Sequence, residues 1–297
     1  LNNFRTVLNS AAWSSSAPMA TPRTYPGSTG IQTAALGWGG YLDPSPYTNL
    51  TEEYNGSGWE TGGVIPTPSQ RQAGFGIQTA AVSAGGQGSV GPPTTTSAVD
   101  EYNGTAWTGA TAIPTITDGA AGAGILTAGL FIGGLGLAPS TTSLATTFEY
   151  DGTSWTPSPA LNTGRAGAAA CGTQTAGLSF AGTTSPASPA AVANTELYNG
   201  TSWTAVSAMN VARNELGGSG TSTSALGYAG EISGDTVQTV TESYDGSSWT
   251  VAPTMATARD RVGGAGASNA SALVFAGTTG SVTGATEEFN QSTSVIT

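Results

Sequence analysis

The feature that most constrains the fold is an aromatic residue followed by a tight turn, which recurs six times along the 297-residue chain. Consecutive copies lie 45 to 48 residues apart, and in the first five a tryptophan stands five positions after the aromatic residue. The anchor aromatics are Tyr54, Tyr102, Tyr150, Tyr198, Tyr244 and Phe289, and the tryptophans are Trp59, Trp107, Trp155, Trp203 and Trp249. A repeat of roughly 40–50 residues is typical of the blades of a β-propeller.

Each copy is predicted to form four short antiparallel strands. A Gly/Ala-rich stretch, a polar turn and an apolar run that ends in small residues, as at 71–86, predict the first hairpin. Asn-Gly or Asp-Gly after the aromatic residue predicts the second hairpin, because these residues tolerate the positive φ of a tight turn. We therefore predict an all-β fold, a single six-bladed β-propeller over residues 1–297. Its blades are expected at about 23–68, 69–116, 117–163, 164–211, 212–257, and 258–297 together with 1–22.

The sequence also predicts how the ring closes. The position five residues after Phe289 is a serine, whereas Trp13 near the N-terminus has no anchor aromatic of its own and is followed by Pro18-Met19. We expect the N-terminal strand to pair with the C-terminal blade, which would bury both terminal strand edges. The register of this pairing stays open, because Leu8-Asn9-Ser10 also matches the Tyr-Asn-Gly pattern.

The order of these features resembles the Kelch repeat over nearly the whole chain: a glycine pair after an apolar strand, a tyrosine with an acidic or amide turn, a tryptophan, and a Met/Pro loop that ends in arginine. The sequence departs from that pattern in the last three copies, where the glycine pair becomes Ala-Gly at 181–182, 229–230 and 276–277. The run Glu-Ser-Tyr-Asp-Gly-Ser-Ser-Trp-Thr at 242–250 is most similar to Thr/Gly/Ala-rich Kelch-like repeat proteins of marine bacteriophages. The resemblance implies a virion protein.

Charge narrows the range of partners. The chain has a net charge of −11 and no histidine, and all seven basic residues are arginines. A chain this acidic is repelled by phosphate backbones and by anionic membrane surfaces. No apolar run approaches the roughly 18–20 residues of a membrane span. We therefore expect no nucleic-acid partner and no membrane insertion.

The residues needed for common catalytic sites are scarce. Without histidine, a Ser-His-Asp triad and a His-ligated zinc or copper site are excluded, and Cys171 is the only cysteine. Adjacent carboxylates such as Glu52 and Glu53 face opposite sides of a strand, so they do not form an acid/base couple. Calcium could bind through Asp43 or Asp235, although neither lies in a recognisable ligand loop. We expect no enzyme, no catalytic residue, no cofactor and no metal.

Five copies carry an arginine before the first predicted strand and an acidic residue two positions before the anchor aromatic. The third copy has Asp118 and Phe148 at these positions, so it lacks the arginine and the acid together. Exposed guanidiniums would bind an anionic ligand. Their joint loss instead favours ion pairs within one blade, because either charge buried alone would be strongly destabilising. The predicted structural pairs are Arg23–Glu52, Arg71–Asp100, Arg165–Glu196, Arg213–Glu242 and Arg261–Glu287.

The loops between the second and third strands differ most among the copies, and loop variation on a constant scaffold is where binding specificity resides. They are expected at about 41–50, 87–98, 135–146, 183–194, 231–240 and 278–285. The candidate ligand-binding residues are Tyr41, Asp43, Tyr47, Glu231 and Asp235.

We predict a non-enzymatic module of a phage tail, fibre or capsid surface that binds other virion proteins or a host-surface glycan, at the virion surface or outside the cell. The alternative is a secreted bacterial lectin or adhesin domain, and a glycan-cleaving enzyme is the least favoured function.

Overall fold

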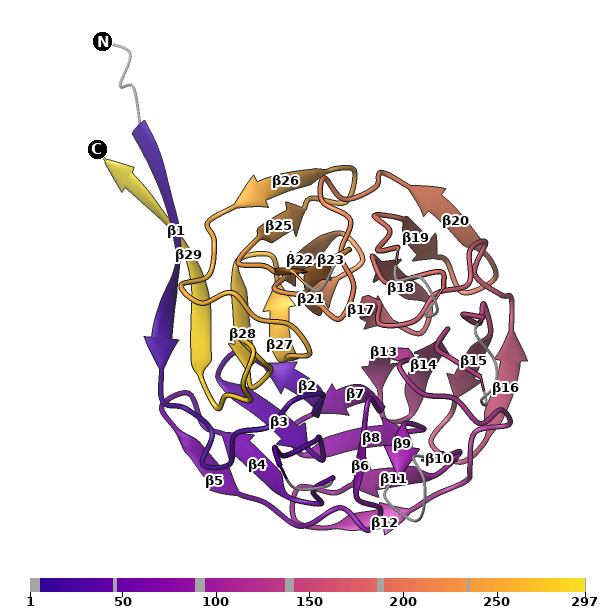
Figure 1. Cartoon of the computed structure of the whole chain (residues 1–297). Coiled ribbons are helices and arrows are strands. Elements are labelled where there is room, and N and C mark those ends of the chain that lie inside the picture. The colour runs from indigo at the N-terminus through magenta and orange to yellow at the C-terminus, as the bar shows by residue number, and fades with distance from the viewer. Residues whose placement is uncertain are drawn as a thin grey trace.

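Six four-stranded antiparallel sheets surround a common axis in the computed structural model, as the sequence predicts (Figure 1). The structure describes residues 6–44, 47–88, 94–136, 142–185, 190–233 and 236–296. This part of the chain contains no α-helix, and therefore none that could cross a membrane.

The strands of each blade follow the chain from the axis outward. Blade 1 contains β2 (Gly27–Ile31), β3 (Ala34–Trp38), β4 (Thr51–Tyr54) and β5 (Trp59–Thr61). Blade 2 contains β7 (Ala73–Ile77), β8 (Ala80–Ala84), β11 (Val99–Tyr102) and β12 (Trp107–Gly109). Blade 3 contains β13 (Ala121–Ile125), β14 (Ala128–Ile132), β15 (Thr147–Tyr150) and β16 (Trp155–Ser158).

The second half of the ring repeats this order. Blade 4 contains β17 (Ala169–Thr173), β18 (Ala176–Phe180), β19 (Thr195–Tyr198) and β20 (Trp203–Val206). Blade 5 contains β21 (Gly217–Thr221), β22 (Ser224–Tyr228), β25 (Thr241–Tyr244) and β26 (Trp249–Ala252). Blade 6 contains β27 (Gly263–Ser268), β28 (Ser271–Phe275), β29 (Thr286–Ile296) and β1 (Thr6–Ser16).

The loops between the second and third strands lie on one face of the disc, which we call the loop face. Two small additional sheets form in these loops. The first consists of β6 (Ser69–Gln70), β9 (Gln87–Gly88) and β10 (Thr94–Thr95), and the second of β23 (Glu231–Ile232) and β24 (Thr236–Val237). In blade 2, β6 belongs to the segment that leads into the innermost strand and pairs with β9 of the loop. In blade 5, Glu231 of β23 forms a bridge with Asn214 of the corresponding segment.

Small residues on the innermost strands allow the blades to approach the axis closely. A Cβ atom at Gly74 of β7 would lie 2.5 Å from the carbonyl oxygen of Ser28 in blade 1. Glycine is therefore required at this position, because no other residue would leave room for the neighbouring backbone.

Tryptophans on the outer strands connect neighbouring blades. Trp107 packs on Tyr102 of the same hairpin, with ring centroids 5.0 Å apart, and its Nε1 donates to Thr51 Oγ1 of the preceding blade at 2.9 Å. The same donation joins Trp203 to Thr147, Trp249 to Thr195, and Trp59 to Thr286, at 3.1–3.2 Å. Blade 2 has Val99 in place of the threonine. The following tryptophan, Trp155, donates instead to a loop carbonyl.

Two rings of backbone hydrogen bonds join all six blades near the axis. In the first ring, each donor residue has a φ of 52° to 63° and donates its amide to the equivalent residue of the preceding blade, at 2.9–3.2 Å. Its members are Tyr25, Arg71, Gly119, Gly167, Glu215 and Arg261. In the second ring, a glycine after the second strand donates to the following blade at 2.8–2.9 Å. The donors are Gly40, Gly86, Gly134, Gly182, Gly230 and Gly277, and the acceptors are Ser69, Thr117, Arg165, Arg213, Arg259 and Arg23.

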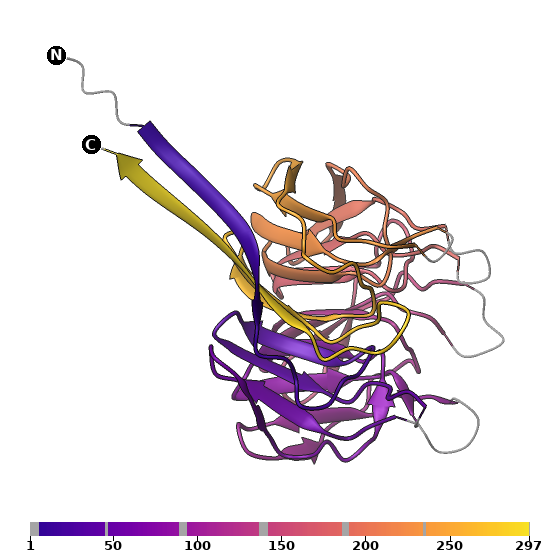
Figure 2. The ribbon, with the colours of Figure 1, turned by 60° about the vertical axis from the view of Figure 1, so that its left-hand side comes forward.

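The N-terminal strand closes the ring, as predicted, and the structure settles its register. β1 pairs with β29 over eleven residues, with Trp13 opposite Phe289. Trp13 Nε1 donates to Thr241 Oγ1 of blade 5 at 2.9 Å, so Trp13 takes the position of the missing sixth tryptophan. Both strands continue beyond the disc as a two-stranded ribbon (Figure 2).

Trp13→Ala should weaken the closure between blades 5 and 6. The ring of Trp13 lies 5.3 Å from those of Tyr228 and Phe289, so truncation removes these contacts and the bond to Thr241. We expect the free energy of unfolding in urea to fall by about 2–4 kcal/mol. Val251→Ala on the outer strand of blade 5 is the control, because Val251 is 72% exposed. Equal stability of the two variants would contradict the closing role of Trp13.

Candidate functional site

Three of the predicted ion pairs are present inside their blades. Arg213 Nη2 lies 3.1 Å from Glu242 Oε1, and both side chains are fully buried. Arg23 pairs with Glu52 and Arg165 with Glu196 in the same way. The acids also accept backbone amide hydrogen bonds, such as the one from Asn210 to Glu242 at 2.7 Å. Burial lowers the pKa of these arginines, and the paired glutamates oppose that shift.

The other two predicted pairs are wrong, because Arg71 and Arg261 lie two residues after the position that pairs with the acid. Arg259 pairs with Glu287 at 2.9 Å, whereas Arg261 does not contact that residue. Arg71 lies 2.7 Å from Glu215 and 3.8 Å from Asp118, and it does not contact Asp100. The signal that separates the two positions is the distance to the first strand. The pairing arginines stand four residues before it, whereas Arg71 and Arg261 stand two residues before it.

Asp100 is therefore a buried carboxyl group that pairs with no cation of the described chain. It is 5% exposed, and the position that holds an arginine in four of the blades is Ser69 in this one. Burial raises the pKa of Asp100 from 3.8 to about 6. Blade 2 thus retains the acid without its partner, which corrects our inference that the two residues are lost only together.

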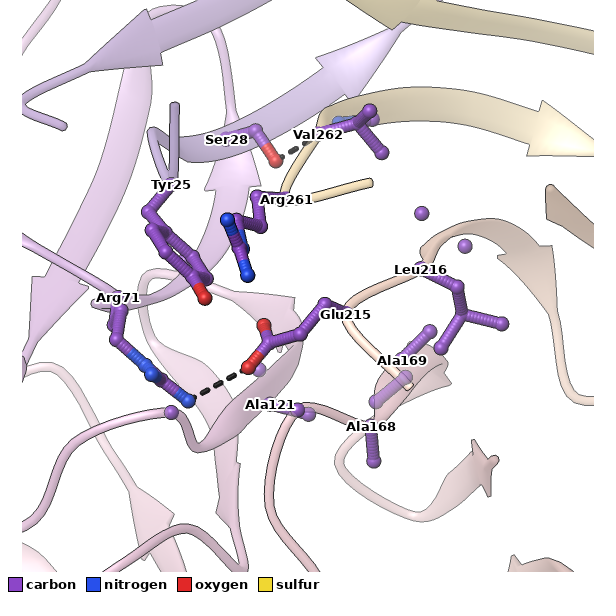
Figure 3. Close-up of a pocket in the computed structure, with 18 of the residues that line it drawn as sticks. Tyr25, Ser28, Arg71, Ala121, Ala168, Ala169, Glu215, Leu216, Arg261 and Val262 are labelled. Carbon is purple, nitrogen blue, oxygen red and sulfur yellow. Dashed lines mark hydrogen bonds and ion pairs between the residues drawn. The ribbon is translucent and has the colours of Figure 1, made fainter. Parts of the chain in front are cut away.

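The residues of the first backbone ring surround the mouth of the central channel on the loop face. A cavity of about 140 Å³ is lined there by Tyr25, Arg71, Gly119, Gly167, Glu215 and Arg261, and we call it the axial cavity. Figure 3 shows the Tyr25 hydroxyl, the Arg71 guanidinium and the Glu215 carboxylate pointing toward one another across it. The two glycines contribute no side chain, and the side chains of Arg71 and Glu215 lie beside them, 3.1 and 3.0 Å from where a Cβ atom would stand.

Tyr25 organises the cations of the axial cavity. The guanidinium carbons of Arg71 and Arg261 lie 4.8 and 5.3 Å from the centroid of its ring, within the range of cation–π attraction. Arg71 is held by Glu215, whereas the side chain of Arg261 is 34% exposed. Burial, with the nearby Glu215, raises the pKa of the Tyr25 hydroxyl, which therefore stays protonated and can donate a hydrogen bond.

Four carboxyl groups surround these two arginines. Asp118 accepts a hydrogen bond from Gln87 Nε2 at 2.6 Å, and Glu231 accepts one from Asn214 Nδ2 at 3.0 Å. Burial raises the pKa of Glu215 and of Asp260, and the neighbouring Glu231 raises the latter further. Within the described residues, no group of acidic or cysteine side chains has the arrangement of a metal site.

A second cavity of about 340 Å³ lies beside the axial cavity, between the loops of blades 1 and 6. We call it the tyrosine cavity, because Tyr25, Tyr41 and Tyr47 line it together with Asp43, Gln70 and Arg261. The rings of Tyr41 and Tyr47 meet edge to face with centroids 6.1 Å apart, and both side chains are half-buried. Tyr25 and Arg261 line both cavities, so the two spaces adjoin at these residues.

The predicted ligand-binding residues divide into three groups. Tyr41, Asp43 and Tyr47 line one cavity. Glu231 is only 6% exposed and faces the buried charge cluster, because its strand pairs with Asn214 at the inner edge of the loop face. Asp235 lies outside the described residues.

Tyr25, Gln70 and Arg261 were not predicted to bind a ligand. Tyr25 occupies the same position of the first backbone ring as Arg71 and Arg261. Aligning the copies on this position would have grouped Tyr25, Arg71 and Arg261. Gln70 lies in the short strand β6 and donates to Gln87 at 2.8 Å.

Comparison with known proteins does not place the chain in a family. No protein-family model matches its sequence, and no curated protein is significantly similar to it.

Removing one arginine should distinguish the scaffold from the site. Arg213→Met leaves Glu242 buried without its cation, so we expect the free energy of unfolding to fall by about 3–5 kcal/mol. Arg261→Met removes a partly exposed side chain whose ion pair with Asp260 spans 3.4 Å without a hydrogen bond, so we expect a smaller loss, about 1–2 kcal/mol. Urea unfolding of both variants measures the difference. Similar losses would show that Arg261 is also part of the scaffold.

Asp100→Asn should stabilise the protein at neutral pH. The native state holds the Asp100 proton more tightly than the unfolded chain does, so wild-type stability falls as the pH rises from about 4 to about 6 and then levels off. The variant has no carboxyl group to titrate at this position. Its free energy of unfolding should therefore exceed that of the wild type by about 3 kcal/mol at pH 7 and equal it below about pH 4. Unfolding of both proteins between pH 3.5 and 7 tests this, and a gain that does not depend on pH would contradict it.

Proposed function

We propose that the protein is a non-enzymatic binding module whose loop face takes a glycan in the tyrosine cavity. The single observation that supports this is the lining of that cavity, to which three tyrosines, an aspartate, a glutamine and an arginine contribute. Its volume of about 340 Å³ lies at the lower end of the range for small-ligand sites, roughly 300–1,000 Å³. A space of this size accommodates one or two sugar rings.

The chemistry of a sugar matches this lining. The C–H face of a pyranose is apolar and can pack on a tyrosine ring, while the tyrosine hydroxyl remains available for hydrogen bonds. Asp43 can accept hydrogen bonds from sugar hydroxyls, and Gln70 and Arg261 can donate to them. Tyr41 and Tyr47 lie on either side of one loop whose ends pair with each other, which holds the two rings in a defined geometry before a ligand arrives.

For the biological setting, we propose the surface of a phage virion, on the tail, fibre or capsid. The proposal rests on a resemblance of the sequence alone, to the Kelch repeat and to Thr/Gly/Ala-rich phage proteins. A secreted bacterial lectin or adhesin would use the same cavity. Mass spectrometry of purified particles distinguishes the two, because a virion protein copurifies with the particles at a constant ratio to the capsid protein.

A second candidate function is docking to another virion protein through the opposite face. Ile31, Ile77 and Ile125 end the innermost strands of blades 1, 2 and 3 and are 44–53% exposed. Blade 4 has Thr173 and blade 5 has Thr221 at the equivalent position, so the apolar residues lie on one half of the ring. This asymmetry favours a contact that covers blades 1–3.

Binding of the purified chain to a glycan array tests the main proposal. We expect selective binding, and we expect Tyr47→Ala to weaken it at least tenfold, which corresponds to about 1.4 kcal/mol for a central aromatic contact. Tyr47→Phe should retain most of the affinity, because the ring is preserved. Ile125→Ala on the opposite face is the control and should bind as the wild type does. Unchanged binding by Tyr47→Ala would show that the glycan does not bind in the tyrosine cavity. No binding by the wild type would overturn the proposed function.

A further inference from the structure

Arg261 differs from the other arginines of the described chain in its hydrogen bonding. Arg23, Arg165, Arg213 and Arg259 each donate to a glutamate and to backbone carbonyls inside a blade, and Arg71 donates to Glu215. The guanidinium of Arg261 donates no hydrogen bond to any described residue. A guanidinium carries five N–H donors, so Arg261 can offer its terminal nitrogens to a ligand.

The acids near Arg261 leave its terminal nitrogens without a hydrogen bond among the described residues. The carboxylate of Glu215 is taken by Arg71, whose Nη2 lies 2.7 Å from Glu215 Oε1. The closest acid to Arg261 is Asp260, with Oδ2 3.4 Å from Nε. Asp260 is 1% exposed; burial raises its pKa, the adjacent Arg261 lowers it, and a hydrogen bond with Glu231 raises it. Arg261 Nε therefore faces Asp260, whereas the terminal nitrogens of Arg261 donate to no described residue and remain available to a ligand.

The position of Arg261 is set by Tyr25 and by the backbone ring. Its amide donates to Glu215 and its carbonyl accepts from Tyr25, so the backbone is fixed on both sides. Its guanidinium stacks 5.3 Å from the Tyr25 ring centroid. The Tyr25 hydroxyl also makes no hydrogen bond with a described residue, and Figure 3 shows it beside the tip of Arg261. Two unsatisfied donor groups thus meet where the axial cavity joins the tyrosine cavity.

We propose that the glycan bound in the tyrosine cavity carries a carboxylate, and that Arg261 and the Tyr25 hydroxyl recognise this group. The inference rests on the proposed function and names its ligand class as acidic sugars, such as uronic or sialic acids. A planar guanidinium matches a carboxylate with two parallel N–H···O bonds. The sugar ring then extends toward Tyr41 and Tyr47, and Asp43, which is exposed, accepts hydrogen bonds from hydroxyls away from the carboxylate.

Matched glycans test this assignment directly. The probes are oligosaccharides that end in glucuronic, galacturonic or N-acetylneuraminic acid, each paired with the counterpart in which the carboxyl group is reduced to an alcohol. We expect the wild type to bind at least one acid more than tenfold tighter than its reduced counterpart. Arg261→Gln should bring that ratio close to one, and Arg261→Lys should keep part of it, since lysine retains the charge but not the paired donors.

The outcomes separate the inference from the function on which it rests. Equal binding of acid and reduced glycans, lost in Tyr47→Ala, would overturn the carboxylate assignment and leave the glycan site in place. A preference for the acid that survives in Arg261→Gln would overturn the role of Arg261. No binding of any probe by the wild type would overturn both proposals. Thermal unfolding of Arg261→Gln within a few degrees of the wild type confirms that any change in ratio reflects recognition.

Discussion

The arrangement of the whole ring depends on backbone hydrogen bonds between neighbouring blades. Both axial rings use amides and carbonyls only. The donors of the second ring are all glycines with a φ of 90° to 100°, whereas the first ring leaves the side chain free to vary. The first ring requires a left-handed φ, which glycine adopts freely and other residues adopt at a cost of about 1 kcal/mol. A tyrosine, two arginines and a glutamate occupy four of its six positions. Side chains can therefore vary at the channel mouth while the scaffold stays constant.

The buried charged side chains divide in the same way, into those of the constant scaffold and those at the channel mouth. Four blades hold an arginine and a glutamate deep in the sheet, where each ion pair satisfies its own hydrogen bonds. The charges around Tyr25 lie at the mouth, with more acids than bases and with donors left unsatisfied. Charges of the first kind maintain the blade. Those of the second kind would be destabilising in a scaffold, which is why they identify the loop face as the candidate site.

The fold was predictable from the sequence because the Tyr-turn-Trp hairpin is local and repeats six times. The closure was predictable because Trp13 matches the tryptophan position of the repeat that the last copy lacks. The register of the arginines was not predictable by composition, since Arg71 and Arg23 look alike until their distance to the next strand is considered. Tyr41, Asp43 and Tyr47 were found because they lie in one loop. Tyr25 and Arg261 come from opposite ends of the chain, and only closure of the ring brings them together.

That closure also sets an order of events during synthesis. β1 is the first strand of the propeller to be made, and its only partner, β29, is the last. At about 5–20 residues per second, the roughly 270 residues between them take on the order of 15–55 s to translate. Throughout this interval β1 has no native partner, and the junction of the two cavities does not exist. Residues 10–16 are serine and alanine apart from Trp13, so β1 lacks the run of large apolar residues that promotes aggregation while it is unpaired.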